Sequence, residues 1–179
     1  MPGHLSPLGI KQAKQIAERL KDVKIDYIYS SDLKRAKDTA LEILKYHPNI
    51  PIEFTSEIRQ RYLGEWEGKT KAVLGILNDA DSIMKSPKDG ESFKDLYLRA
   101  GKFIPKIVDK HKGQTILLVC HNYIAQALLS IIKNIEYTDD YQKYLLSSEK
   151  ISNTSINIFE IDENKICKVE IYNCTKHLV

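Results

Sequence analysis

The sequence predicts an α/β fold, a three-layer α/β/α sandwich with a mainly parallel sheet and one antiparallel strand. Two observations lead to this prediction. Short apolar segments alternate with longer amphipathic ones, which favours parallel strands joined by helices that cover both faces of the sheet. The last two apolar segments are separated only by the turn-like residues 162–165, which predict a closing hairpin and therefore an antiparallel strand.

The first helix has the clearest local signals. Residues 7–23 place apolar side chains at helical spacing, Ser6 is available as a cap, and Pro7 occupies the first helical position. The same patterns predict strands at 26–30, 51–55, 115–120, 155–161 and 166–172, helices at 32–46, 70–84, 92–111 and 123–133, and helical turns around 138–147.

Composition narrows the class of protein. A chain of 179 residues with 42% hydrophobic and 28% charged residues is typical of one globular domain, here expected over residues 1–179. The net charge of +3 is spread along the chain, which does not favour nucleic-acid binding. No apolar run is long enough to span a bilayer, and no signal peptide follows Met1. Three cysteines without metal spacing favour a reducing compartment, so the expected location is the cytoplasm.

Two strand–helix units carry polar side chains at the point where the strand ends. His121 follows the strand at 115–120, and Arg35 lies one turn inside the helix behind Ser30 and Ser31, which we expect to cap that helix through their hydroxyls. Ligands of open α/β sheets bind at this edge, and an arginine fork with a histidine suits a phosphate group. The alternatives are that Arg35 is a solvated surface charge and that His121 is a core histidine bonded to backbone.

Six motifs, in order along the chain, resemble those of the histidine phosphatase superfamily, whose fold is phosphoglycerate-mutase-like: PLGIKQA, SSDLKRAKDTA, GEWEGKT, DGESFKDL, VCHNY and NTSINIFEI. The resemblance implies hydrolysis or transfer of a phosphoryl group on a small phosphate monoester through a phosphohistidine, without a metal or other cofactor. It also implies that Arg35 and His121 hold the phosphoryl group, and that the backbone amide of Asn122 adds a further donor.

The departures from the family pattern concern the catalytic groups. The family's R-H-G motif lies on a first strand upstream of the helix at 7–23, so the resemblance implies an N-terminally truncated domain without its first central strand. The family's acid is a glutamate at the position of Gln60, and an amide cannot protonate a leaving group. Glu57 and Glu65 are the nearest carboxylates that can replace it, with surface residues as the alternative reading. His4 is a poor substitute for the nucleophile, since it lies beside Pro2 and Gly3.

Three hypotheses follow. The first is an enzyme that acts on phosphate monoesters once its N-terminal strand is restored, with the chain as given inactive. The second is a catalytically inactive relative that binds phosphorylated ligands or a protein partner. The third, a nucleotide-binding domain, lacks a glycine-rich phosphate loop. The segment between Gly68 and Gly90 is expected to select the substrate. Without the first strand, the strands at 115–120 and 156–161 should leave a gap or pair directly, and exposed edges there favour a homodimer.

Overall fold

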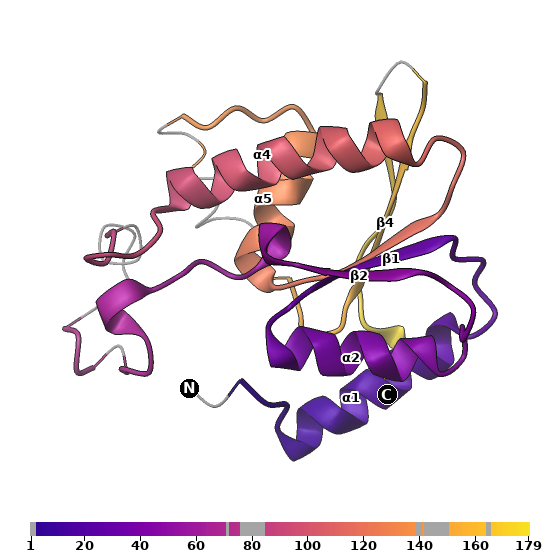
Figure 1. Cartoon of the computed structure of the whole chain (residues 1–179), viewed down its shortest axis with the longest axis horizontal. Coiled ribbons are helices and arrows are strands. Elements are labelled where there is room, and N and C mark those ends of the chain that lie inside the picture. Colours follow the sequence, from indigo (N-terminus) through magenta and orange to yellow (C-terminus); the bar gives the residue numbers. More distant parts are fainter. Residues whose placement is uncertain (1–2, 71, 76–84, 139–140, 142–150, 164–165) are drawn as a thin grey trace.

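Three parallel strands form the centre of the computed structural model, which describes residues 3–70, 72–75, 85–138, 141, 151–163 and 166–179 (Figure 1). They are β1 (Tyr27–Ser31), β2 (Ile52–Thr55) and β3 (Ile116–Val119), in the order β2-β1-β3. Ile28 of β1 lies opposite Ile52 on one side and Leu117 on the other. The expected parallel sheet is therefore confirmed, with β1 as its middle strand.

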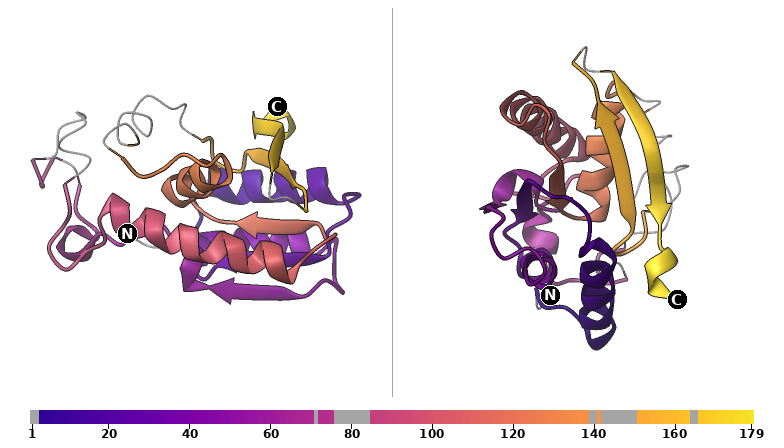
Figure 2. Two further views of the ribbon diagram at one scale, coloured as in Figure 1. Left: turned by 90° about the horizontal axis from the view of Figure 1, so that it is seen from above. Right: turned by 90° about the vertical axis from the view of Figure 1, so that its right-hand side faces the viewer.

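Helices cover both faces of this sheet (Figures 1 and 2). On one face, α1 (Pro7–Leu20) and α2 (Lys34–Leu44) pack an apolar cluster against Leu117 and Val119 of β3. On the other, α4 (Phe93–Lys110) and α5 (Asn122–Ile132) enclose a larger core that includes Tyr29 and Leu118. Alternate residues of β3 thus face opposite layers, as the strand geometry requires. The three-layer arrangement agrees with the prediction.

The helix ends explain why the sequence folds this way locally. Ser6 accepts a hydrogen bond from the Gly9 backbone N–H at 3.1 Å, and Pro7 is the first residue of α1. Ser92 and Asp95 form a reciprocal capping box at the start of α4. The expected serine cap of α2 is wrong, because the helix begins only at Lys34 and its cap residue is Leu33.

The closing hairpin forms a sheet of its own. Strand β4 (Ile156–Ile161) pairs in antiparallel fashion with β5 (Cys167–Cys174), and β4 does not pair with β3. Ile156 nevertheless packs against the same cluster as Leu117 and Val119, so the two sheets share one apolar layer over α1. Within the described part of the chain, the facing edges of β3 and β4 have no strand partner. Of the two expected outcomes, direct pairing is wrong and an interrupted sheet is what the structure has.

Short turns complete the described chain: the 3₁₀ turns η1 (Ser56–Ile58), η2 (Gly64–Trp66) and η3 (Lys176–Leu178). The helix expected at 70–84 and the turns expected around 138–147 lie largely outside the described residues, and residues 72–75 form turns. In the described ranges, no helix combines the length and apolarity that a membrane span needs.

Candidate phosphate-binding site

The carboxyl ends of β1 and β3 bring Ser31 and His121 together. Ser31 is the last residue of β1 and is fully buried, and His121 follows β3 directly before α5. The Nε2 atom of His121 lies 2.9 Å from the hydroxyl oxygen of Ser31, which also accepts a hydrogen bond from the Leu33 backbone N–H at 3.3 Å. The serine that was expected to cap α2 therefore orients the histidine ring instead.

His121 is neutral at ordinary pH. Burial is the largest cause that lowers its pKa to about 3, and the positive charges of Arg35 and Arg99 lower it further, while Asp32 acts in the opposite direction. A neutral ring can accept the Ser31 O–H at Nε2, and Nδ1 then carries the ring proton. In this tautomer, the ring has an N–H group to donate to an anion.

Arg35 is half-buried rather than fully solvated. Burial lowers its pKa, and the carboxylate of Glu67 acts in the opposite direction. Its charge also acts on His121, so the two residues that the sequence singled out lie within electrostatic reach of each other. A half-buried guanidinium within electrostatic reach of a neutral histidine is suited to binding a phosphate dianion.

The position of Asn122 makes its backbone N–H available at the start of α5. It is the first residue of α5, where backbone N–H groups have no intrahelical acceptor and point outward from the helix start. Its side-chain amide donates to the carbonyl of Ile151 at 2.8 Å, which ties the start of α5 to the segment before β4. The neighbouring N–H groups at the helix start thus face the same edge of the sheet as His121.

Gln60 lies between two anchored arginines. Arg59 forms a two-point ion pair with Asp32, the residue after Ser31, with Nε to Oδ1 at 2.5 Å and Nη2 to Oδ2 at 2.6 Å. The guanidinium of Arg61 lies 4.2 Å from the centre of the Phe93 ring. The side-chain oxygen of Gln60 is buried and has no hydrogen-bond partner among the described residues. A buried amide oxygen without a donor is uncommon in folded proteins, where buried polar groups are normally hydrogen-bonded.

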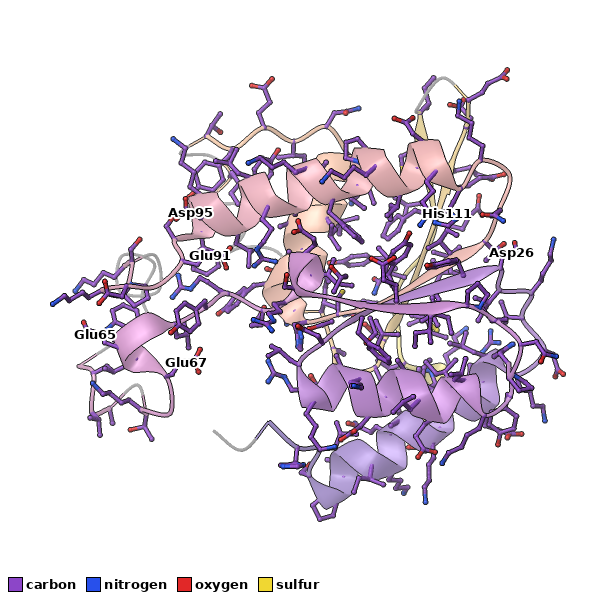
Figure 3. All side chains as sticks on the ribbon, viewed as in Figure 1. Asp26, Glu65, Glu67, Glu91, Asp95 and His111 are labelled. Carbon is purple, nitrogen blue, oxygen red and sulfur yellow. The ribbon has the colours of Figure 1, made fainter. Side chains whose placement is uncertain are left out.

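The two alternative carboxylates differ in position. Glu57 is half-buried in η1, and its backbone carbonyl accepts a hydrogen bond from Arg99 at 2.6 Å. Glu65 is exposed on the outer side of η2, away from the sheet edge, whereas Glu67 lies on the side nearer to α2 (Figure 3). Of the carboxylates in the G-E-W-E-G motif, the one that acts on Arg35 is therefore Glu67, which the sequence reasoning did not single out.

Two other chemical roles, a cysteine nucleophile and a metal site, find little support among the described residues. Burial raises the pKa of the Cys120 thiol to about 12, so this cysteine, next to His121, remains protonated and is a poor nucleophile. In the described ranges, no three His, Cys, Asp or Glu side chains are grouped so that they could hold a metal ion.

Comparison with known proteins agrees with this geometry. The profile of the histidine phosphatase superfamily (branch 1) matches residues 3–175. The chain is 32% identical to Phosphoglycerate mutase-like protein 4 of Arabidopsis thaliana, over 97% of this chain and 76% of that protein. It is also 32% identical to the Metal-independent phosphoserine phosphatase of the same plant, over 90% of this chain and 67% of that protein.

A solved structure shows the same fold. Bacillus stearothermophilus YhfR superposes with a TM-score of 0.85 at 28% identity, covering 98% of this chain and 87% of that chain. The motifs, the strand order and the residues gathered at the carboxyl edge of the sheet all point the same way, and the chain belongs to the histidine phosphatase superfamily.

Proposed function

We propose that the protein hydrolyses or transfers the phosphoryl group of a small phosphate monoester through a phosphohistidine intermediate. The observation that carries this proposal is a neutral His121, bound to Ser31 at the carboxyl ends of β1 and β3, within electrostatic reach of Arg35. Relatives described as a phosphoserine phosphatase and as a phosphoglycerate-mutase-like protein support a small phosphorylated substrate. The comparisons give no support to the catalytically inactive alternative.

In this proposal, the described residues bind the phosphoryl group and stabilise charge. Arg35 donates a two-point hydrogen bond to two phosphoryl oxygens, His121 donates from its ring N–H, and the backbone N–H of Asn122 adds a third group. These donors hold the negative charge that builds up on the phosphoryl oxygens when phosphorus is attacked. In this proposal these donors take the role that a metal ion has in other phosphatases.

The nucleophile in this proposal is the histidine of an Arg-His-Gly strand seated between β3 and β4. The supporting observation is that the facing edges of these strands have no strand partner among the described residues, although both lie over α1. A strand placed parallel to β3 would end beside His121, because parallel strands share one carboxyl edge. Among the other described histidines, His47 and His111 are poor candidates, because they are only 9% and 8% exposed and hydrogen-bond within the fold.

The proposal predicts that the chain binds phosphate and that a variant with an added Arg-His-Gly strand also turns over substrate. The full chain should bind inorganic phosphate in isothermal titration, and binding should weaken about 10- to 100-fold in Arg35→Ala. A variant with an apolar strand ending in Arg-His-Gly fused before residue 3 should turn over a panel of phosphate monoesters that includes phosphoserine and 3-phosphoglycerate. If the wild-type chain binds no phosphate, and the fused variant folds but turns over no monoester, the proposal is wrong.

Substrate selection is assigned in the same proposal to the segment between Gly68 and Gly90, much of which lies outside the described residues. We also propose association into a homodimer through the facing edges of β3 and β4, which have no strand partner in the described part of the chain. Sedimentation of the chain alone and of the fused variant tests it, since filling the edges should remove the tendency to associate.

A further inference from the structure

The guanidinium of Arg99 binds one carboxylate and two backbone carbonyls. Its Nε and Nη2 atoms donate to the two carboxylate oxygens of Glu91, each at 2.8 Å. Its Nη1 atom donates to the carbonyl of Glu57 at 2.6 Å and to the carbonyl of Arg59 at 3.1 Å. Four contacts from three nitrogen atoms match the fork-shaped donor arrangement of a guanidinium, and a lysine could not make them together.

Glu91 extends this arrangement toward the start of η2. Its backbone N–H donates to the carbonyl of Tyr62 at 2.8 Å, and its carboxylate accepts from the backbone N–H of Tyr62 at 3.3 Å. Farther along, the Glu65 backbone N–H donates to the Lys88 carbonyl at 3.2 Å. Gly64 lies at the same crossing with a φ of 48°, and a Cβ there would collide with that carbonyl. The segments 57–65 and 88–91 are thus fastened at several points.

The consequence is that Gln60 and Arg61 are held from both sides. On one side, Arg59 has its carbonyl bound by Arg99 and its guanidinium bound by Asp32. On the other, Tyr62 is bound by Glu91 through both of its backbone polar groups. Two residues between two anchors have little freedom to move away from the carboxyl edge of the sheet.

The contacts of Arg61 link residues 60 and 61 to the start of α5. Its guanidinium stacks on Phe93, whose ring packs edge-on against Tyr123 with the ring centres 5.0 Å apart. Tyr123 is the second residue after His121, so the stack reaches from the anchored segment to the start of α5. Asp32, bound by Arg59, follows the serine that contacts His121.

We propose that Glu91 and Arg99 are positioning residues that hold Gln60 and Arg61 against the phosphate site. Glu91 and Arg99 together are called the clamp. This inference rests on the proposed function, since it assigns the clamp to that same site. The side chains of Arg99 and Glu91 are only 20% and 15% exposed, so their contacts are largely shielded from competing water. The Arg99 charge also contributes to lowering the pKa of His121, which places the clamp within electrostatic reach of the site.

The test compares Arg99→Lys and Glu91→Gln with Arg19→Lys, an arginine on the exposed surface of α1. The probe is inorganic phosphate, with affinity measured by titration calorimetry and backbone amides followed by NMR. We expect each clamp variant to bind phosphate about 10-fold or more weakly, because small displacements of binding groups carry large losses. The amide signals of residues 60–62 should shift, and Arg19→Lys should stay within about 2-fold of the wild type.

A second substitution separates positioning from a general loss of stability. Gln60→Glu places a carboxylate against the site and should weaken phosphate binding through repulsion, by about 10-fold at neutral pH. If Arg99 acts by holding Gln60, this effect should shrink in the Arg99→Lys background, because neighbouring effects are not additive. Should Arg99→Lys fail to fold, the same cycle is run with Glu91→Gln, which keeps one acceptor in place.

The outcomes distinguish the two proposals. Unchanged phosphate affinity in both clamp variants would overturn the clamp, and so would an undiminished effect of Gln60→Glu in the clamp background. If the wild-type chain binds no phosphate at all, the proposed function fails. The clamp is then decided by the amide signals of residues 60–62 alone, since shifts in both clamp variants support it and unchanged signals overturn it.

Discussion

Acidification should destabilise the protein through His121 in a defined pH range. Its pKa is lowered to about 3 in the folded chain, from an ordinary value of 6.5. A histidine with a lowered pKa binds fewer protons when folded than when unfolded. Its contribution to stability is therefore complete above about pH 6.5 and is lost as the pH falls toward about 3.

The size of the effect follows from the two pKa values. Integrating the difference in proton binding between about pH 7 and pH 4.5 gives a loss of about 2.5 kcal/mol in the free energy of unfolding. Asp32 and Asp95 have lowered pKa values and contribute mainly at lower pH, and His177 adds a smaller loss of the same sign. Comparison with a variant that lacks only His121 removes these shared contributions.

Urea unfolding of the wild type and of His121→Gln at both pH values measures this difference directly. The wild type should lose about 2.5 kcal/mol more than the variant between the two conditions. Glutamine retains a polar group that can contact the Ser31 hydroxyl, so the substitution mainly removes the titrating ring. Equal losses in the two proteins would refute the reasoning, because they would mean that the fold does not hold His121 in its neutral form.

Three further predictions concern binding and catalysis. Arg35→Ala should weaken phosphate binding about 10- to 100-fold in calorimetry, whereas Lys37→Ala, at an exposed position, should change it less than about 3-fold. Equal losses in the two variants would contradict a phosphate contact made by a partly buried Arg35. The chain as given should not turn over p-nitrophenyl phosphate, and turnover that disappears in His121→Ala would show this wrong, with His4 as the first suspect. In the variant carrying an added Arg-His-Gly strand, Gln60→Glu should accelerate hydrolysis of esters with poor leaving groups more than that of p-nitrophenyl phosphate; equal acceleration would argue against an acid at this position.

Local signals made the elements and two of the site residues predictable. The helices α1 and α4 combine apolar spacing with caps that involve neighbours only three residues apart, so their formation depends on nearby sequence alone. Arg35 and His121 sit at fixed offsets from the ends of apolar strands, which determines the edge of the sheet to which they belong.

Sequence reasoning led to the wrong prediction for Ser31, whose hydroxyl can bind either a nearby helix start or a distant side chain. Ser31 lies near a helix start, where a hydroxyl commonly caps, yet its partner is a histidine 90 residues away. The same holds for the closing hairpin, whose pairing was readable but whose separation from β3 was not, because it depends on which edges meet in space.

Local sequence patterns therefore account for the order of helices and strands, the family and the chemical character of Arg35 and His121. The tertiary structure alone decided that His121 is neutral, because burial and the charge of Arg99 arrive from other elements. It also decided that Glu91 and Arg99 fasten the segment around Gln60, since those contacts join residues 29 to 42 positions apart. Periodicity and capping act over a few residues, whereas desolvation and long-range hydrogen bonds exist only once the chain has closed around them.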